Sequence, residues 1–235
     1  MYGTHNLPFH MEQEGLSISF ERNDLGFIYT RTALDDTITK VVMPQHEEVL
    51  INPVEPLNKP KALTSLLYID LENVLMLAPR ITKTIYLLFP IEIGVFIVSN
   101  GNYQLLDILS LVKQKFTLYG DPKNGLLCKY YKSEVYSSPP ALNSSHQGII
   151  ELHIFNSNSD WAEVKKIIFN AYGMKIYYDS TIVSMKASLK LKNAELGETD
   201  FEDTPLKAGQ EKSLEVYTSR KLAISSTKFV MEFGI

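Results

Sequence analysis

The chain has 235 residues, of which 45% are hydrophobic and 21% charged, so it can bury a core of ordinary size, and its composition excludes a disordered or fibrous protein. Its formal net charge of −4 disfavours nucleic-acid binding, because proteins of that class carry a basic face that displaces counterions from phosphates. The single cysteine, Cys128, excludes an intramolecular disulfide, and we expect it to be a buried thiol in a reducing compartment.

No segment has the pattern of a secretory leader or of a membrane span. The first residues lack a basic region followed by an apolar run. The most apolar stretch, residues 85–98, is too short to cross a bilayer and is interrupted by Pro90 and Glu92. We therefore expect a cytoplasmic protein without a transmembrane segment.

Strand signals dominate the first half of the chain. Alternating apolar and polar residues, and runs of branched and aromatic residues, are typical of strands because they suit a pleated, half-buried surface. We expect strands at residues 16–20, 27–30, 65–71, 84–89, 94–98, 103–106, 115–119 and 126–131.

Three turn patterns predict how some of these strands pair. Polar residues 22–24 predict a short loop between the first two strands. Asn100-Gly101 tolerates the positive φ angles of a type I′ turn, so the runs on either side of it should pair antiparallel. Residues 120–125, which contain glycine at both ends and Pro122, predict a second hairpin with a longer loop.

Residues 137–145 are the best candidate for a linker. Pro139 and Pro140 resist regular strand pairing, and the flanking serines offer little to bury. Further strands are expected beyond it, at residues 149–155, 175–178, 183–191, 213–217 and 228–233. We therefore predict a mainly β fold of two antiparallel β-sandwich-like modules with little helix, one at residues 1–136 and one at residues 147–235.

Residues 160–172 fit two structures. A capping-box spacing and an apolar stripe that Gly173 can terminate predict a helix. The polar turn at residues 156–159 instead predicts a hairpin that continues into a strand. We favour the strand, with the helix as the alternative.

The sharpest local feature is the proline ribbon, residues 51–60 (INPVEPLNKP), which holds three of the 11 prolines. Each proline fixes φ and biases the preceding residue toward an extended shape, so the ribbon should be stiff and should not be a central strand. It can present polar groups to a ligand at little ordering cost, or it can be a plain crossover that covers a sheet edge. The ribbon residues that we single out as a binding surface are Asn52, Pro53, Glu55, Pro56 and Asn58.

Glu92 is the only charge in the apolar run of residues 89–96 (FPIEIGVF), and we add it to the candidate binding surface. A carboxylate among apolar neighbours either finds a cationic partner or has its pKa raised, as in general acids. Strand alternation predicts instead that Glu92 points to solvent, or that it pairs with Arg80 or Lys83.

The sequence predicts no metal site and no cofactor. The five histidines do not cluster at a metal-binding spacing, and no phosphate-cradling loop or nucleophile elbow is present. The acidic residues 195–203 can supply oxygen ligands to calcium, but they lack the ligand order of an EF-hand, and acidic loops are usually only solvated. Both interpretations of this segment stay open.

Two motifs carry a family resemblance. The runs INPVEPLNKPK (51–61) and TIYLLFPIEIGVF (84–96), with the opening residues MYG, resemble an uncharacterised archaeal family catalogued only as a domain of unknown function. The resemblance covers most of the chain. It implies an archaeal, cytoplasmic protein and supplies no activity, ligand or catalytic residue.

The sequence therefore favours a non-enzymatic module that binds an unknown protein or a small-molecule ligand, or that assembles with copies of itself. Its binding surface would lie where the proline ribbon meets Glu92. The alternative is a hydrolase in which Glu55 and Glu92 form a carboxylate pair. That chemistry requires the two carboxyl groups to face one cavity at a separation of roughly 5–10 Å.

Overall fold

The computed structural model describes residues 1–34, 36–60, 63–99, 101–193, 195–216 and 228–235. Within these ranges the regular structure is β-strand, apart from one short 3-10 turn, η1 (Ala171–Gly173). The strands of the first half are β1 (Gly3–Asn6), β2 (Phe9–Gln13), β3 (Leu16–Asn23), β4 (Gly26–Ala33), β5 (Asp36–Val42), β6 (Glu48–Val54), β7 (Leu66–Leu77), β8 (Thr82–Pro90), β9 (Glu92–Ser99) and β10 (Asn102–Leu109). The remaining strands are β11 (Phe116–Tyr119), β12 (Leu126–Ser133), β13 (Gln147–Asn156), β14 (Ala162–Asn170), β15 (Tyr177–Tyr178), β16 (Val183–Leu191), β17 (Gly197–Glu202), β18 (Glu211–Lys212) and β19 (Phe229–Met231).

The N-terminal sandwich consists of two four-stranded antiparallel sheets. Their strand orders are β2-β3-β4-β5 and β1-β6-β9-β10. Residues alternate between core and solvent along β3 and β4, as expected for sheets with one buried face. The facing side chains of the two sheets form one apolar cluster, which includes Ile18, Phe20, Tyr29, Val49, Ile51, Ile93 and Val95.

The second sandwich contains the remaining strands. One sheet has the order β11-β12-β7-β14, and the other has the order β18-β15-β16-β13-β8, with β17 and β19 continuing from β16. Two of its pairings are parallel, β12 with β7 and β13 with β16. Its larger core includes Leu67, Ile69, Leu87, Phe89, Ile150, Leu152, Ile167, Phe169, Met185 and Leu189. The fold is thus mainly β and sandwich-like, as predicted.

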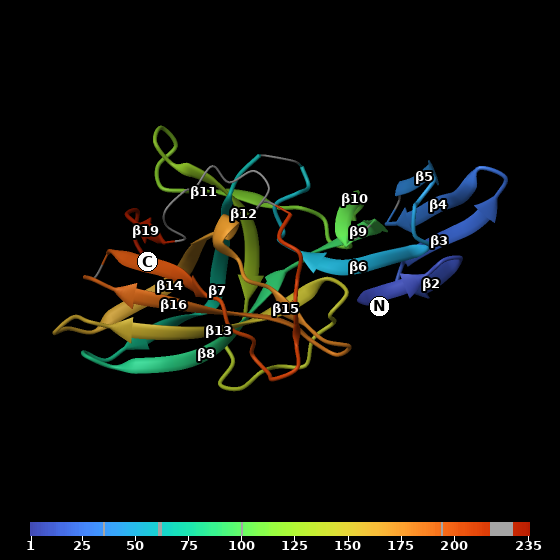
Figure 1. Cartoon of the computed structure of the whole chain (residues 1–235). Coiled ribbons are helices and arrows are strands. Elements are labelled where there is room, and N and C mark those ends of the chain that lie inside the picture. Colours follow the sequence, from blue (N-terminus) through green and yellow to red (C-terminus); the bar gives the residue numbers. More distant parts are fainter. Residues whose placement is uncertain (35, 61–62, 100, 194, 217–227) are drawn as a thin grey trace.

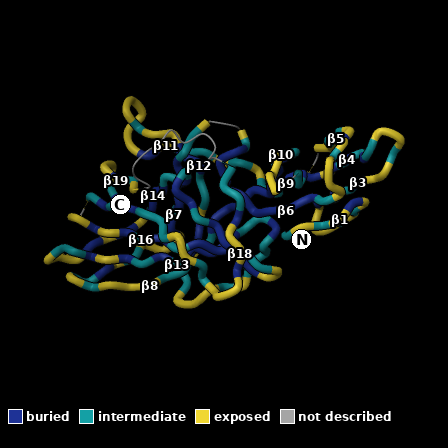
Figure 2. Tube along the Cα trace, viewed as in Figure 1, coloured by how far each residue is buried: buried dark blue, intermediate teal, exposed yellow. Residues whose placement is uncertain are grey.

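The chain crosses between the two sandwiches at one junction. β6 leads through the proline ribbon toward β7, β8 passes through Ile91 into β9, and β10 leads through residues 110–115 to β11. Figure 1 shows β6 and β9 lying between the blue N-terminal hairpins and the strands of the second sandwich. In Figure 2 buried residues run without interruption through this junction. The proline ribbon therefore lies at the centre of the molecule.

The local predictions are largely confirmed. The hairpins β3–β4, β9–β10 and β11–β12 form as expected from their turns. Residues 162–170 form strand β14, which settles the ambiguity of that segment in favour of the strand. Asn100 of the predicted turn lies outside the described residues, as do Lys61 of the family motif and Tyr217.

One ribbon prediction is wrong, because its first residues lie in a central strand. β6 runs between β1 and β9 and includes Pro53. The pairing with β1 reaches only to Ile51, so Pro53 has a neighbouring strand on one side alone, where it lies opposite Ile93. Proline has no N–H to donate to a second neighbouring strand, so it is tolerated here as it is on an edge strand.

The strand predicted at residues 213–217 is also wrong for its described part. Residues 213–216 form no strand. Leu214 and Val216 pack instead against the outer face of the β6–β9 sheet, on a small cluster formed by Leu50, Val54 and Phe96. Tertiary packing on an apolar face has overridden the strand propensity of this segment.

Strand pairing crosses the expected linker. β8 pairs with β13, and β7 pairs with β14, so residues on both sides of the segment 137–146 share two sheets. The division of the chain into two modules at this segment stays a prediction. The strand pairing across it determines whether the two fragments of a cut chain stay together. No helix among the residues described is long and apolar enough to cross a membrane.

We predict that a protease cuts the native chain near Pro139, because Ser137, Ser138 and Pro139 are exposed. The two fragments should stay associated under native conditions, since both sheets of the second sandwich hold strands from each side of the cut. Limited proteolysis with mass spectrometry, followed by gel filtration with and without denaturant, measures this. Fragments that separate without denaturant would contradict it.

Cys128 provides a second prediction. Its side chain is fully buried in β12, and burial raises the pKa of its thiol to about 12. Because the thiolate is the reactive form, native Cys128 should resist thiol reagents at neutral pH and react once the chain unfolds. Labelling with and without denaturant measures this. Rapid labelling of the native protein would show that the thiol is accessible.

Candidate functional site

All six residues of the candidate binding surface are buried. Asn52 and Pro53 lie near the end of β6, Glu55, Pro56 and Asn58 follow in the ribbon, and Glu92 begins β9. Glu92 is fully buried, while Glu55 and Asn58 keep 3% and 8% of their surface exposed. The structure therefore brings these residues together at the junction, but inside the protein.

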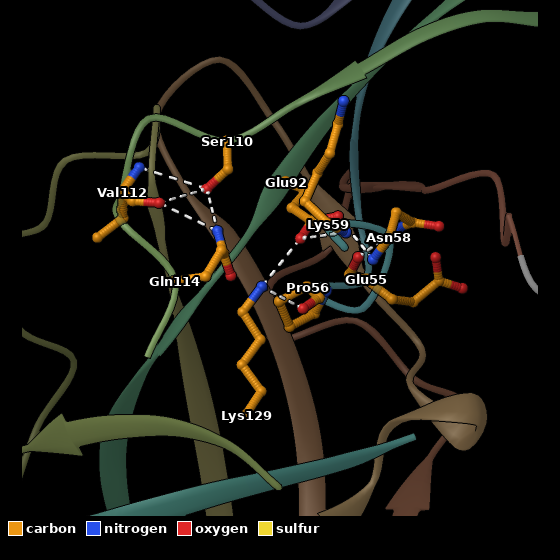
Figure 3. A network of polar contacts seen from close by, with 9 residues as sticks. All are labelled: Glu55, Pro56, Asn58, Lys59, Glu92, Ser110, Val112, Gln114 and Lys129. Carbon is orange, nitrogen blue, oxygen red and sulfur yellow. Dashed lines mark hydrogen bonds and ion pairs between the residues drawn. The ribbon is translucent and has the colours of Figure 1, made fainter. Parts of the chain in front are cut away.

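The Glu92 carboxylate is the centre of a polar network. It accepts hydrogen bonds from the Lys129 ammonium at 2.9 Å, from the Asn58 backbone N–H at 2.9 Å and from the Lys59 backbone N–H at 3.3 Å. Figure 3 shows the ribbon curving around this carboxylate. Because both carboxylate oxygens accept hydrogen bonds, the buried charge is well compensated.

Lys129 is the cationic partner that the sequence analysis missed. It lies on β12, is 3% exposed, and also donates a hydrogen bond to the Pro56 carbonyl. Burial lowers the pKa of its ammonium, and the negative charge of Glu92 opposes that shift. The expected partners Arg80 and Lys83 do not pair with Glu92. The sequence held one indirect signal for this ion pair. The apolar strand predicted at residues 126–131 contains a single lysine, and the apolar run of residues 89–96 contains a single glutamate.

The other ribbon residues anchor the C-terminal segment 213–216. Asn52 donates to the Ser213 hydroxyl at 2.7 Å and accepts from the Leu214 backbone N–H at 3.4 Å. The Glu55 carboxylate accepts from the Val216 backbone N–H at 3.3 Å. These hydrogen bonds hold the segment against the sheet that contains β6.

The geometry does not favour the Glu55–Glu92 pair as acid and base. Figure 3 shows the Glu55 carboxylate pointing away from that of Glu92. Each of the two groups is committed to hydrogen bonds within the protein. A carboxyl group that exchanges protons with a substrate needs access to it, which full burial denies to Glu92.

Gln114 lies beside this network, in the connection between β10 and β11. Its amide nitrogen donates to the Ser110 hydroxyl at 2.8 Å and to the Val112 carbonyl at 3.0 Å. Its carbonyl oxygen is buried and accepts no hydrogen bond from any described residue. Figure 3 shows the Gln114 amide facing the Lys129 ammonium. A buried acceptor without a donor is costly, so this position is suited to a water molecule or a ligand.

A pocket opens beside this network, and we call it the junction pocket. Its volume is about 260 Å³, and it lies where the β4–β5 hairpin, the ribbon and the connection after β10 meet. Lys59, whose backbone N–H donates to Glu92, belongs to its wall, and so does Gln114. Its lining residues are Arg31, Ala33, Leu34, Asp36, Lys59, Leu109, Ser110, Val112, Lys113 and Gln114.

A second, larger groove lies near the turn end of the β9–β10 hairpin. It has a volume of about 580 Å³ and is bordered by the connection between β5 and β6. Met43 and Tyr103, which line it, are 74% and 48% exposed. A third hollow, of about 400 Å³, lies beside Tyr119 and Lys166 in the second sandwich.

The acidic stretch at residues 195–203 is largely strand β17, and two of its carboxylates have cationic partners. Glu198 pairs with Lys192 at 2.6 Å, and that interaction lowers the pKa of its carboxyl. Asp203 pairs with Lys212 at 2.6 Å. Within the part of the chain that the structure describes, no three His, Cys, Asp or Glu side chains group as a metal site.

The buried ion pair gives a stability prediction. Glu92→Gln leaves the Lys129 ammonium buried without its counter-charge, so the free energy of unfolding at pH 7 should fall by about 3–5 kcal/mol. Because burial lowers the pKa of Lys129, the folded chain releases this proton at lower pH than the unfolded chain, whose value is about 10.5. The penalty should therefore shrink as the pH rises toward that value. Denaturant melts between pH 7 and pH 10 measure it.

Glu72→Gln is the matched control. Glu72 pairs with Lys132 at 3.2 Å, but both side chains are about half exposed, so its loss should cost less than about 1 kcal/mol. Replacing both members of the buried pair, as Glu92→Leu with Lys129→Met, should recover part of the loss because no charge stays buried. A Glu92→Gln effect no larger than that of the control would contradict the buried ion pair.

Comparison with known proteins gives a family but no activity. No curated protein and no solved structure matched this chain. A family model described as "Protein of unknown function (DUF432)" matches residues 1–233, and this agrees with the resemblance carried by the ribbon and Glu92 motifs. Since the match extends over both sandwiches and the junction between them, the chain belongs to the DUF432 family.

Proposed function

We propose that this chain is a non-enzymatic binding module that takes a small molecule in the junction pocket. The observation that carries the proposal is the continuity between the pocket and the ion-pair network. Lys59 and Gln114 line the pocket, and the Lys59 backbone is held by the buried carboxylate of Glu92. A site built on such support is pre-organised, so ligand binding need not order the ribbon.

The position of the pocket also supports this proposal. Ligand sites form preferentially where two structural units meet, and they combine an apolar lining with a few fixed polar groups. The junction pocket has both, with Ala33, Leu34 and Leu109 beside Arg31 and Gln114. The six residues predicted to bind the ligand are buried. The pocket beside them, which Lys59 of the ribbon lines, is the place where a ligand would bind.

The hydrolase alternative has less support. It needs Glu92 to exchange protons, whereas the same carboxylate holds Lys129 and two backbone N–H groups. Assembly with a protein partner or with a second copy has one observation in its favour, the exposure of Met43 at the 580 Å³ groove. An archaeal origin and a cytoplasmic location stay predictions.

We predict that small organic molecules bind saturably in the junction pocket. Protein-observed NMR with a chemically mixed fragment library measures this through the backbone amides of residues 109–114. Val112→Trp fills the pocket with a larger side chain and should weaken the binding at least about tenfold, which corresponds to about 1.4 kcal/mol.

Leu25→Trp is the control, because Leu25 is 67% exposed in the loop between β3 and β4 and does not line the pocket. It should leave binding unchanged. The proposal is wrong if no compound in the library shifts these amides, or if Val112→Trp binds every hit as the native chain does.

A further inference from the structure

We propose that the ligand of the junction pocket is a small organic anion, a carboxylate or a phosphate ester, whose charged group binds the guanidinium of Arg31. This inference rests on the proposed function and specifies the chemical class of the ligand. It is carried by the hydrogen bonds of Arg31, by the charges on the pocket rim and by the shape of the apolar wall.

Arg31 is a buried cation in the pocket wall with part of its donor set unused. Its side chain is 2% exposed, yet it lines the pocket. Its Nε donates to Asp107 at 3.1 Å, and its Nη1 donates to the Asp36 carboxylate at 3.0 Å and to the Asp36 carbonyl at 3.2 Å. None of these bonds uses Nη2, which donates to no described residue. A guanidinium has five N–H donors in a fixed fork, so a planar or tetrahedral anion can take those that stay free.

The orientation of this guanidinium is fixed before any ligand arrives. Asp107 is 7% exposed and also accepts a hydrogen bond from the Tyr29 hydroxyl at 2.9 Å. Its other oxygen accepts from the Ile108 backbone N–H at 2.9 Å. Arg31 is thus held between β4, the start of β5 and β10, and only the ligand would need to be ordered on binding.

The rim of the pocket adds positive charge. Lys59 and Lys113 line it, and neither makes an ion pair with a described residue. Among the described residues of the lining, the one acidic side chain, Asp36, is already paired with Arg31. The described part of the lining therefore holds three cations and one carboxylate, in a protein whose formal net charge is −4. Such a local excess of positive charge favours an anion over a neutral or cationic ligand.

Part of the lining is apolar and includes a residue with a positive φ. Leu34 is 52% exposed and has a φ of +53°, in the left-handed region that a leucine rarely adopts. This φ follows from the tight turn of the β4–β5 hairpin, in which Ala33 pairs directly with Asp36. Ala33, Leu109 and Val112 continue the apolar surface. The ligand should therefore carry a short apolar body beside its anionic group.

The volume limits the size of this ligand. The 260 Å³ of this open pocket lie at the lower end of the volumes of small-molecule sites, which are about 300–1,000 Å³. A small organic acid or a small phosphate ester fits this space.

The experiment uses butyrate, its neutral analogue butyramide, and inorganic phosphate as probes, titrated at constant ionic strength. The readout is the NMR shift of the Arg31 side-chain Nε together with the amides of residues 109–114. Butyrate and phosphate should shift these signals saturably, and butyramide should bind at least about tenfold more weakly, because the free Nη2 donors and the rim lysines act on the charge.

Variants on the rim test the charge without touching Arg31, whose replacement endangers folding. Lys59→Gln and Lys113→Gln should each weaken butyrate and phosphate binding about 2- to 5-fold, since an ion pair near a surface contributes up to about 1 kcal/mol. Lys115→Gln is the matched control, because Lys115 is exposed but does not line the pocket, and it should change nothing. Leu34→Gly relieves the positive φ, so it should not lower Tm while weakening butyrate more than phosphate.

The outcomes separate this inference from the proposal on which it rests. If butyramide binds as well as butyrate, or if neutral fragments alone bind in the pocket, the anion inference is wrong and the binding module stands. Shifts that do not saturate, or that are equal in Lys113→Gln and Lys115→Gln, indicate a non-specific salt effect and also overturn the inference. If neither the anions nor any fragment binds, both proposals are wrong.

Discussion

The structure depends on one buried ion pair, between Glu92 and Lys129. Each charge comes from a different sandwich, because Glu92 begins β9 and Lys129 lies on β12. Removing two charges from water costs several kcal/mol, and their attraction offsets this only if the remaining hydrogen bonds are also made. Here the proline ribbon makes them, with two N–H groups to the carboxylate and one carbonyl to the ammonium. Three distant segments must therefore meet in one geometry.

That requirement explains why the junction is rigid enough to support a pocket. A shift of one sandwich against the other would separate the two charges or leave the ribbon amides unpaired, and each loss is costly in a dry interior. Lys59 is held directly by its bond to Glu92, and Gln114 faces Lys129 from the next connection. The contacts that compensate the buried charges of Glu92 and Lys129 thus also hold the pocket wall at Lys59.

The sequence predicted what local chemistry determines. Gly101 and the glycines around Pro122 marked two hairpins, because turns of that type need particular residues whatever the rest of the fold does. No spacing rule identified the partner of Glu92, since Lys129 lies 37 residues away on a strand of a separate sheet, and its place in an apolar strand was the one indirect signal. The contact between Arg31 and Asp107 spans 76 residues and was missed for the same reason. Long-range pairing also placed β7 and β8 with the C-terminal strands rather than with the N-terminal sandwich.

The proline ribbon combines a local property that the sequence predicted with a long-range contact that it did not. Its stiffness was predicted from sequence, and the interpretation was that it presents polar groups at little ordering cost. The structure shows which groups these are, the backbone N–H groups of Asn58 and Lys59, and their acceptor is a carboxylate of the same chain. Pro56 and Pro60, on either side, have no N–H and restrict the backbone of the unfolded chain, so less entropy is lost when the ribbon is fixed. The ribbon therefore binds a buried anion within the protein, and its outer side is left to line the pocket.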